Sequence, residues 1–464
     1  MAKRRKGQQK TDRSTTALPV LRTAVAGIDL GAEKHWVAGP PTEDGEPNVR
    51  VFGTTTPQLQ LLADWLRKLG VQSVAMESTS VYWIPLYELL ESVGFEVLLV
   101  NARELKTVPG RKTDMQDCQW IQLLHSCGLL RGSFRPKESI CSLRALQRQL
   151  ANLVQERSKV VQWMQKALDQ MNVQVHRAVT DITGKTGIAI VRAIVNGERD
   201  PAVLAALRDP RCRKSAHQIA EHLTGNWRSE HLFNLEQTLR LYDCLQEQIV
   251  AYDQQVLNEI KAMTPPERKD EHVPAHPKPS KQRAICQRGE QELRETLCRF
   301  SGVDLTRIDG IAVGTAQIIL SEVGIDLSAF PDENHFASWL RLSPRTGFSA
   351  GKKLKKKTAV GASRIAHALA LAAMTLEKTQ TALGAFFRKK ARHKERGVAV
   401  FATARKLAHY IYRMLRYGVD YHDQGAKAYE ERFNQRRLKT LSQSANSFGF
   451  NLTPLVLDAE VVSG

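Results

Sequence analysis

The amino-terminal part of the chain alternates short apolar runs with stretches of helical spacing. Between two of the runs, leucines recur at helical spacing and the pattern ends at Gly70, which predicts a helix over 56–69. A second helix is predicted near 83–92. The apolar runs have the length and residue types of β-strands and lie at 24–30, 34–37, 49–52, 71–77 and 96–100. Three strands followed by alternating helix and strand predict a small α/β domain with a mixed sheet.

Downstream of residue 142 the apolar pattern is helical. Leu143 to Met164 place apolar side chains at alternating three- and four-residue steps, and Tyr242 to Val256 form a second heptad-like seam. The two predicted helices can pair as antiparallel arms, or each can meet a copy in another protomer. A charged, proline-rich stretch from Pro265 to Lys281 is predicted to be a linker or an exposed insertion. Beyond Gly418 the rhythm is lost, and we expect a poorly ordered tail.

Charge and composition narrow the class of protein. The 464 residues carry a formal net charge of +19, and such a surplus favours a nucleic acid or an anionic membrane as partner. No window reaches the roughly 18 uncharged apolar residues of a spanning helix, and the start Met-Ala-Lys-Arg-Arg-Lys lacks the apolar core of a signal peptide. The first 22 residues form a basic arm, expected to be disordered, that is a solvated tail or a loose phosphate contact. Seven scattered cysteines without a Cys-x-x-Cys pair indicate reduced thiols.

Four acidic residues stand where strands and a helix can bring them together. Asp29 ends the first predicted strand and Glu77 ends the fourth. Asp114 and Asp117 lie three residues apart on one face of a predicted helix. Four carboxylates in one pocket would need a divalent cation, Mg²⁺ or Mn²⁺, and two such ions about 4 Å apart are the usual device for breaking phosphodiester bonds. Each acid taken singly is more often a surface or capping residue, although Asp29 follows an apolar strand, where an unpaired acid costs stability.

Basic residues and glycines predict contacts with phosphate. Gly310 and Gly314 lie in an apolar turn before a predicted helix, as in a helix-hairpin-helix, whose backbone N–H groups bind a DNA phosphate; a plain helix turn is the alternative. Ser349 lies in a loop that is basic over 344–357, and a serine becomes a good nucleophile only where a base, a metal or a positive field stabilises its alkoxide. The residues predicted to bind nucleic acid are Arg111, Lys112, Gly310, Gly314, Arg345, Lys352, Lys353, Lys355, Lys356 and Lys357.

Four motifs together resemble one known family. Gly27-Ile-Asp-Leu-Gly31, Met76-Glu-Ser-Thr79 and Arg111-Lys-Thr-Asp-Met-Gln-Asp117 look like motifs of the DEDD transposases of bacterial insertion sequences, and Val97-Leu-Leu-Val-Asn-Ala102 fits the same pattern. The resemblance is to insertion sequence family 110, 1111-like subgroup, some members of which are bridge-RNA-guided recombinases. The order Asp, Glu, Asp, Asp also resembles the RNase H-like domain of the Holliday-junction resolvase RuvC. The resemblance covers roughly 24–415.

The resemblance implies a fold of α/β plus all-α class with a defined order of parts. An RNase H-like, RuvC-like domain is followed by a helical coiled-coil arm and a helical transposase domain that carries the helix-hairpin-helix-like element. The implied boundaries are a basic arm at 1–22, the DEDD domain at 23–138, the helical arm at 139–300 with an insertion near 264–285, the transposase domain at 301–418 and a tail at 419–464.

The same resemblance implies a transposase that excises and inserts its own element. Ser349 matches the family serine that attacks DNA and forms a phosphoserine, while Asp29, Glu77, Asp114 and Asp117 hold Mg²⁺. The implied partners are DNA at the element ends and target, a structured guide RNA encoded by the element, and further copies of the chain. The implied homo-oligomer is a dimer to tetramer in which acids and serine from different protomers meet. The implied place of action is the bacterial cytoplasm, at the nucleoid.

Two positions depart from the family pattern, and other functions remain open. Arg341 stands where the family usually has glycine before the Leu-x-Pro element, and Ala350 replaces a common glycine after the serine. Ser343 and Ser363 are therefore alternative nucleophiles. A RuvC-like nuclease or resolvase that uses metal-activated water is the alternative enzyme, and a non-catalytic DNA- or RNA-binding protein is the alternative from another class. An actin-like sugar kinase fits less well, because the second Asp-x-Gly phosphate motif of that fold is lacking.

Overall fold

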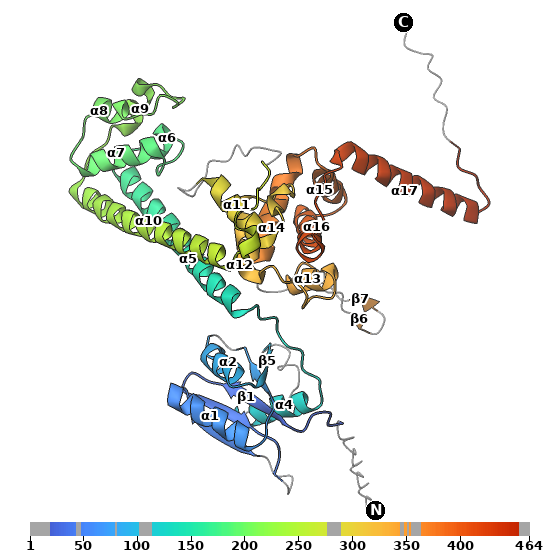
Figure 1. Ribbon diagram of the computed structural model, residues 1–464. Coiled ribbons are helices and arrows are strands. Elements are labelled where there is room, and N and C mark those ends of the chain that lie inside the picture. The colour runs from blue at the N-terminus through green and yellow to red at the C-terminus, as the bar shows by residue number, and fades with distance from the viewer. Residues whose placement is uncertain are drawn as a thin grey trace, which may run out of the picture. The chain divides into compact units, whose positions relative to one another are not determined.

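The computed structural model divides the chain into two compact units, Met1–Arg135 and Pro136–Gly464 (Figure 1). The structure describes residues 19–42, 48–78, 81–101, 114–275, 289–343, 348–349, 352–353 and 363–453. None of the helices within these ranges is both long enough and apolar enough to cross a bilayer.

The amino-terminal unit is built on a mixed five-stranded sheet, as its apolar pattern predicts. The strands are β1 Val25–Leu30, β2 Lys34–Ala38, β3 Val49–Gly53, β4 Ser73–Glu77 and β5 Glu96–Val100. Their order in the sheet is β3-β2-β1-β4-β5. The pairs β1–β2 and β2–β3 are antiparallel, whereas β1–β4 and β4–β5 are parallel. The central strand β1 therefore joins the antiparallel half of the sheet to its parallel half.

Helices cover both faces of this sheet. Helices α1 (Thr56–Lys68) and α2 (Trp83–Ser92) bury their leucines against one face, together with Ile28 and Met76. Helix α4 (Asp114–Ser126) covers the other face, where Ile121 packs on Ala75 and Val100. Alternate strand residues thus serve alternate faces, as the two-residue period of a strand requires. The residues at even positions of β1 and β4 belong to the main core, and those at odd positions face α4.

The two heptad-like seams pair with each other within one chain. Helix α5 (Glu138–Gln170) and helix α10 (Ser229–Met263) run antiparallel, because residues late in α5 meet residues early in α10. Arg157 donates a 2.6 Å hydrogen bond from Nη1 to Oε1 of Gln246 near the middle of the pair. The pairing uses the apolar seams inside the protomer, so the first of the two alternatives for these helices is confirmed.

Four short helices cap the far end of this arm. They are α6 Val175–Ala178, α7 Lys185–Val195, α8 Pro201–Ala206 and α9 Ala216–Leu223. Ile190 and Leu204 pack there against Met164 of α5 and Leu235 of α10. The arm therefore ends in a small hydrophobic core of its own.

The remainder of the chain is a helical unit with one small hairpin. Its elements are α11 Glu290–Ser301, α12 Val313–Val323, α13 Glu333–Trp339, β6 Phe348–Ser349, β7 Lys352–Lys353, α14 Arg364–Thr375, α15 Ala382–His393, α16 Arg396–Tyr417 and α17 Gly425–Ser447, with 3-10 turns at Pro266–Arg268, Leu305–Arg307 and Leu376–Lys378. Tyr412 is fully buried beside Phe336 and donates a 2.8 Å hydrogen bond to the carbonyl oxygen of Phe330.

One sequence-based expectation about a flexible segment needs correction, while the insertion near 264–285 stays a prediction. The tail beyond Gly418 was expected to be poorly ordered, but Gly425–Ser447 forms α17, whose start is fixed by a hydrogen bond from Ala426 N to Gln380 O at 3.1 Å. The helix was missed because its exposed residues give it little apolar periodicity; Ala426 alone among its described residues is buried. Within the predicted insertion near 264–285, Pro266–Arg268 forms a 3-10 turn and Val273 is buried, while 276–288 lie outside the described residues.

Candidate active site

Asp29 and Glu77 lie at the ends of two neighbouring parallel strands. The register pairs Ile28 of β1 with Met76 of β4, so each acid is the next residue along its strand. Ile28 and Met76 belong to the core on the α1 and α2 side of the sheet. Because side chains alternate along a strand, Asp29 and Glu77 belong to the opposite face, which α4 covers. The sheet therefore brings two of the predicted acids to one edge and one face.

Helix α4 approaches β1 so closely that a side chain on the strand would not fit. A Cβ atom added at Gly27 would lie 2.5 Å from the carbonyl oxygen of Cys118 and 2.8 Å from Cα of Gln122. These are backbone atoms, which cannot turn aside as a side chain can. The glycine two residues before Asp29 is thus required for the contact between strand and helix. That contact sets the distance between Asp29 and the acids of α4.

The pKa of the Cys118 thiol depends on its burial between α4 and the sheet and on the charges of nearby carboxylates. Burial raises its pKa to about 12, and the negative charges of Asp29 and, to a smaller degree, Asp117 add to the rise. Both carboxylates therefore act on the same buried sulfur atom from a strand and from a helix. Asp114 is the first residue of α4, one turn before Asp117 and Cys118. Its side chain lies outside the described residues, as do Arg111 and Lys112.

The acids have the chemistry of a divalent-cation site, although the described side chains do not yet converge on one point. Carboxylate oxygens are the ligands that Mg²⁺ and Mn²⁺ prefer, and Asp29, Glu77 and Asp117 all belong to the face between the sheet and α4. Among the described residues, no three His, Cys, Asp or Glu side chains lie together closely enough to hold a metal ion. The fourth predicted ligand, Asp114, is outside that set.

Ser349 lies in a short hairpin of the carboxy-terminal unit, between α13 and α14. It ends β6 and its backbone pairs with that of Lys352 in the antiparallel β7. Lys353 pairs with Phe348 in the same way. The structure describes the backbone of these four residues, while Arg345, Ala350, Lys355, Lys356 and Lys357 lie outside the described residues. The predicted serine and two of the predicted lysines thus occupy facing strands of one hairpin.

Arg341 shows why a glycine is usual in this place. Leu342 N donates to Ala337 O and Arg341 N donates to Ser338 O, each at 2.9 Å, which is the Schellman pattern that ends a helix. The residue at the turn must be left-handed, and Arg341 has φ of +62°. Glycine adopts this conformation without steric cost, whereas other residues pay about 1–2 kcal/mol. The departure from the family pattern therefore keeps the turn and adds strain to it.

Of the two alternative serines, Ser363 has a structural task. The Oγ atom of Ser363 accepts a 3.0 Å hydrogen bond from the backbone N–H of Ala366 and caps the start of α14. Ser343 is half-buried in the turn that follows α13. An N-cap serine is held by the helix it caps, so Ser363 is a weaker candidate for the nucleophile than Ser349.

The two glycines of the predicted helix-hairpin-helix differ in their surroundings. Gly310 has φ of +87°, and a Cβ atom added to it would lie 3.0 Å from the carbonyl oxygen of Ala372. It is therefore needed for close packing of the turn on α14. Gly314 lies in the exposed first turn of α12, where an added Cβ would meet no atom within 4 Å. Phosphate binding by either glycine stays a prediction, with Gly314 the more accessible of the two.

Comparison with protein families decides the family of the chain. A model of the IS110-type DEDD transposases matches residues 26–173, and a model of transposases of the IS116/IS110/IS902 family matches residues 302–388. Together the two matches cover about half of the chain. The chain belongs to the IS110 family of DEDD transposases. No individual curated protein matches it.

The family assignment places each candidate residue of this IS110-family transposase inside a matched stretch. The first match holds Asp29, Glu77, Asp114 and Asp117, and the second holds Ser349. Most of the arm, including α10, lies between the two matches, and α16 and α17 lie beyond the second. The roles of the five candidate residues remain predictions at this point, because a family match identifies no role.

The structure also shows a buried acid, Glu322, for which the sequence alone predicts no role. Glu322 of α12 is 6% exposed, and its carboxylate accepts hydrogen bonds from Nε and Nη2 of Arg148 at 2.9 and 2.7 Å. Arg144 donates to the Glu322 carbonyl oxygen, and Arg364 of α14 lies 3.9 Å from Oε1. An acid at the end of an apolar helix was the available signal. The cluster joins α5, α12 and α14.

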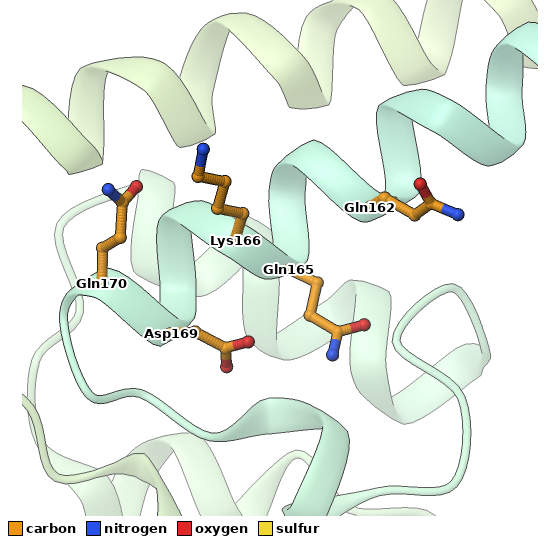
Figure 2. Close-up of a pocket in the computed structure, with 5 residues that line it drawn as sticks. All are labelled: Gln162, Gln165, Lys166, Asp169 and Gln170. Carbon is orange, nitrogen blue, oxygen red and sulfur yellow. The ribbon is translucent and has the colours of Figure 1, made fainter.

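Two of the hollows lined by described residues belong to the carboxy-terminal unit. The larger, about 1080 Å³, is lined mainly by apolar side chains of α5, α10, α11, α12 and α14, with Glu322 and Arg364 at its wall. The smaller follows α5, where Figure 2 shows Gln162, Gln165, Lys166, Asp169 and Gln170 projecting from a single helix. Neither hollow includes a residue predicted to be catalytic.

Proposed function

We propose that this transposase cuts and rejoins DNA through a covalent bond to Ser349, with Asp29, Glu77, Asp114 and Asp117 holding a divalent cation. The arrangement that supports the proposal is the placement of Asp29 and Glu77 at neighbouring ends of the parallel strands β1 and β4, on the face that α4, the helix of Asp117, covers at backbone contact. The strand order β3-β2-β1-β4-β5, antiparallel on one side of β1 and parallel on the other, supports an RNase H-like domain.

Each part has a separate chemical task. The serine hydroxyl gives up its proton as its oxygen forms a bond to phosphorus. The bond from phosphorus to a nucleoside oxygen breaks, and that oxygen departs with the bonding electrons and takes up a proton, so the exchange leaves the number of protons unchanged. A bound Mg²⁺ or Mn²⁺ would neutralise charge on the phosphate oxygens. Lysines of the 344–357 loop would hold the flanking phosphates. Because the phosphoserine keeps a phosphate ester bond, a new DNA end can displace the serine without an outside energy source.

Excision and insertion of an element require more than one cut and more than one kind of partner. We infer a homo-oligomer, dimer to tetramer, in which the acids of one protomer serve the serine of another. We infer also that a structured RNA encoded by the element selects the target, and that the protein acts in the bacterial cytoplasm at the nucleoid. The net charge of +19 supports binding of both DNA and RNA.

Trapping on a denaturing gel tests the nucleophile. Labelled element-end DNA is incubated with full-length protein and its co-purified RNA in Mg²⁺. Wild-type protein and Ser343→Ala, the matched control in the neighbouring turn, should both yield a protein–DNA adduct, while Ser349→Ala and Asp114→Asn should yield none. Nicked DNA without adduct from both wild type and Ser349→Ala would instead establish a nuclease that uses water, the alternative enzyme.

Thermal unfolding with and without metal tests the acids independently of cleavage. A ligand that binds only the folded state raises the midpoint temperature. We expect Mn²⁺ to raise the midpoint of wild-type protein and of Asp64→Asn, whose exposed carboxylate pairs with Arg67 at 3.0 Å. Asp29→Asn should show no such rise. An equal rise in all three proteins would contradict a metal site at this edge of the sheet.

A further inference from the structure

Helices α15, α16 and α17 bring together five cations and three aromatic rings. Nζ of Lys406 lies 4.7 Å from the ring centre of Phe386 and 5.4 Å from that of Tyr429, and Nζ of Lys390 lies 5.7 Å from the Phe386 ring. Lys389 lies over the ring of Phe433. These contacts join α17 to the other two helices. The cations, here named the α15–α17 cationic cluster, are Lys389, Lys390, Lys406, Arg436 and Arg437.

The cluster lacks the acids that balance other cations nearby. Arg413 has a carboxylate partner in Glu333 at 2.6 Å, and Arg396 has one in Glu377 at 2.8 Å. Within the described part of the chain, by contrast, none of the five cations of the cluster forms an ion pair. Burial lowers the pKa of Lys389, and Lys390 and Arg437 lower it further; burial and then Arg436 lower that of Lys406. The helices thus hold like charges together without compensation.

Such an arrangement costs stability unless an anion binds to it. Like charges at close range repel, and among the described residues of the free protein only the contacts with the aromatic rings offset that repulsion. Lys390, Arg436 and Arg437 are exposed, so a polyanion can reach them. A nucleic acid is the polyanion that a DNA transposase meets, and contacts between cations and phosphates release bound counterions, which drives binding.

The positions of the rings favour a duplex over a single strand. Binding of unpaired bases uses open ring faces on which the bases stack. Here Lys389 covers Phe433, and Lys406 lies over both Phe386 and Tyr429, which also pack edge to face with 6.4 Å between centres. The rings therefore position the ammonium groups, and the surface presents charge. Charge alone recognises the phosphate backbone without reading the sequence.

We propose that the α15–α17 cationic cluster binds the phosphate backbone of duplex DNA. The inference rests on the proposed function, because that function makes DNA the expected ligand. It does not depend on DNA cleavage, because binding needs neither the serine nor a metal. All five of its cations lie beyond the stretch 302–388 that matches the family. Helix α17 is 23 residues long, about 34 Å, which is close to one turn of duplex DNA.

Binding of a 30-base-pair duplex to full-length protein, followed by fluorescence anisotropy from 50 to 300 mM salt, tests the proposal. The test variant is Arg436→Glu with Arg437→Glu, both exposed. The matched control is Lys159→Glu with Lys166→Glu, two exposed lysines of α5 with the same change in net charge. We expect the test variant to weaken binding roughly tenfold at 100 mM salt and to lower the slope of log affinity against log salt by about 2, since each lost phosphate contact removes about 0.9. The control should stay within twofold of wild type.

Each other outcome overturns the proposal. Equal losses in both variants would show an effect of net charge alone. A loss confined to duplex RNA of the same sequence would assign the surface to RNA, and a larger loss with single-stranded DNA would point to stacking. Ser349→Ala serves to separate this inference from the proposed function, because it should bind the duplex as tightly as wild type even if the adduct experiment fails. Circular dichroism of both double variants checks that the fold is kept.

Discussion

The two units support their candidate catalytic residues in opposite ways. In the amino-terminal unit, Asp29 and Glu77 end strands of a buried sheet, and α4 packs on that sheet without room for one methyl group at Gly27. In the carboxy-terminal unit, Ser349 ends a two-residue strand in a hairpin between α13 and α14. A hairpin this short has little stability of its own. The fold therefore fixes Asp29 and Glu77, whereas the two-residue strands of the hairpin give Ser349 little support of their own.

The largest expected effect on the carboxy-terminal unit comes from its buried acid. Glu322→Ala leaves Arg144 and Arg148 without their carboxylate and should reduce the free energy of unfolding of this unit by about 3 kcal/mol, the lower end for a buried pair because Arg148 is half exposed. Hydrogen exchange should locate the loss in α12 and α14 and spare the sheet. Glu333→Ala, which frees the more exposed Arg413, is the control and should cost about 1 kcal/mol or less. Equal losses of unfolding free energy in the two variants would show that the Glu322 cluster does not hold α5, α12 and α14 together.

The sheet unit can be disturbed to a similar degree by one methyl group. Gly27→Ala forces α4 away from β1 and should cost about 2–3 kcal/mol, measured as unfolding of the sheet, because backbone atoms of Cys118 and Gln122 occupy the space. Gly53→Ala is the control: its added Cβ would lie 3.2 Å from the flexible side chain of Gln58. If both variants kept wild-type stability, the close contact between α4 and β1 at Gly27 would not be needed to hold the sheet unit together.

Much of this contrast is visible in the sequence. Apolar runs of four to seven residues predict the sheet, and the acids at the ends of two of them predict its edge, because an acid at the end of a buried strand is uncommon. The seams predict the two long helices but leave open whether they pair within one chain or with another protomer, and the structure decides for pairing within the chain. The position of Ser349 could not be derived in this way, since a hairpin of two-residue strands has no periodicity to read. Glu322 and α17 escaped because their roles depend on partners far along the chain.

Acid should weaken the sheet unit through a buried histidine. His125 is 2% exposed, its Nε2 atom lies 2.9 Å from Oγ of Ser73, and burial lowers its pKa, with a further decrease from Arg22 and a smaller opposing effect from Glu96. The unfolded chain therefore takes up a proton below pH 6.5 that the folded chain refuses, so stability is present above that pH and declines below it. Hydrogen exchange of β1 and β4 between pH 7 and 5 should show a loss of at most about 1.4 kcal/mol per pH unit from this residue. His125→Gln should flatten that slope, and an unchanged slope would refute the assignment.

The smallest expected effect concerns the turn before the serine loop. Arg341→Gly relieves a left-handed residue and should stabilise the carboxy-terminal unit by about 0.5 kcal/mol, the steric relief less the entropy cost of glycine. Arg341→Val should destabilise it, because a branched side chain suits φ of +62° least. Thermal unfolding of the three proteins measures both changes. A destabilised glycine variant would mean that the arginine side chain holds the turn.

The paired arm has a mechanical consequence. Helices α5 and α10 contain 33 and 35 residues and lie side by side along about 50 Å. Two rods fastened along their length resist bending far more than either rod alone, so the arm acts as a stiff lever that carries its four-helix tip. Its reach is counted in helical turns: one turn added to both helices would move the tip outward by about 5.4 Å. The length of the paired helices therefore fixes the distance between the base of the arm and any partner bound at its tip.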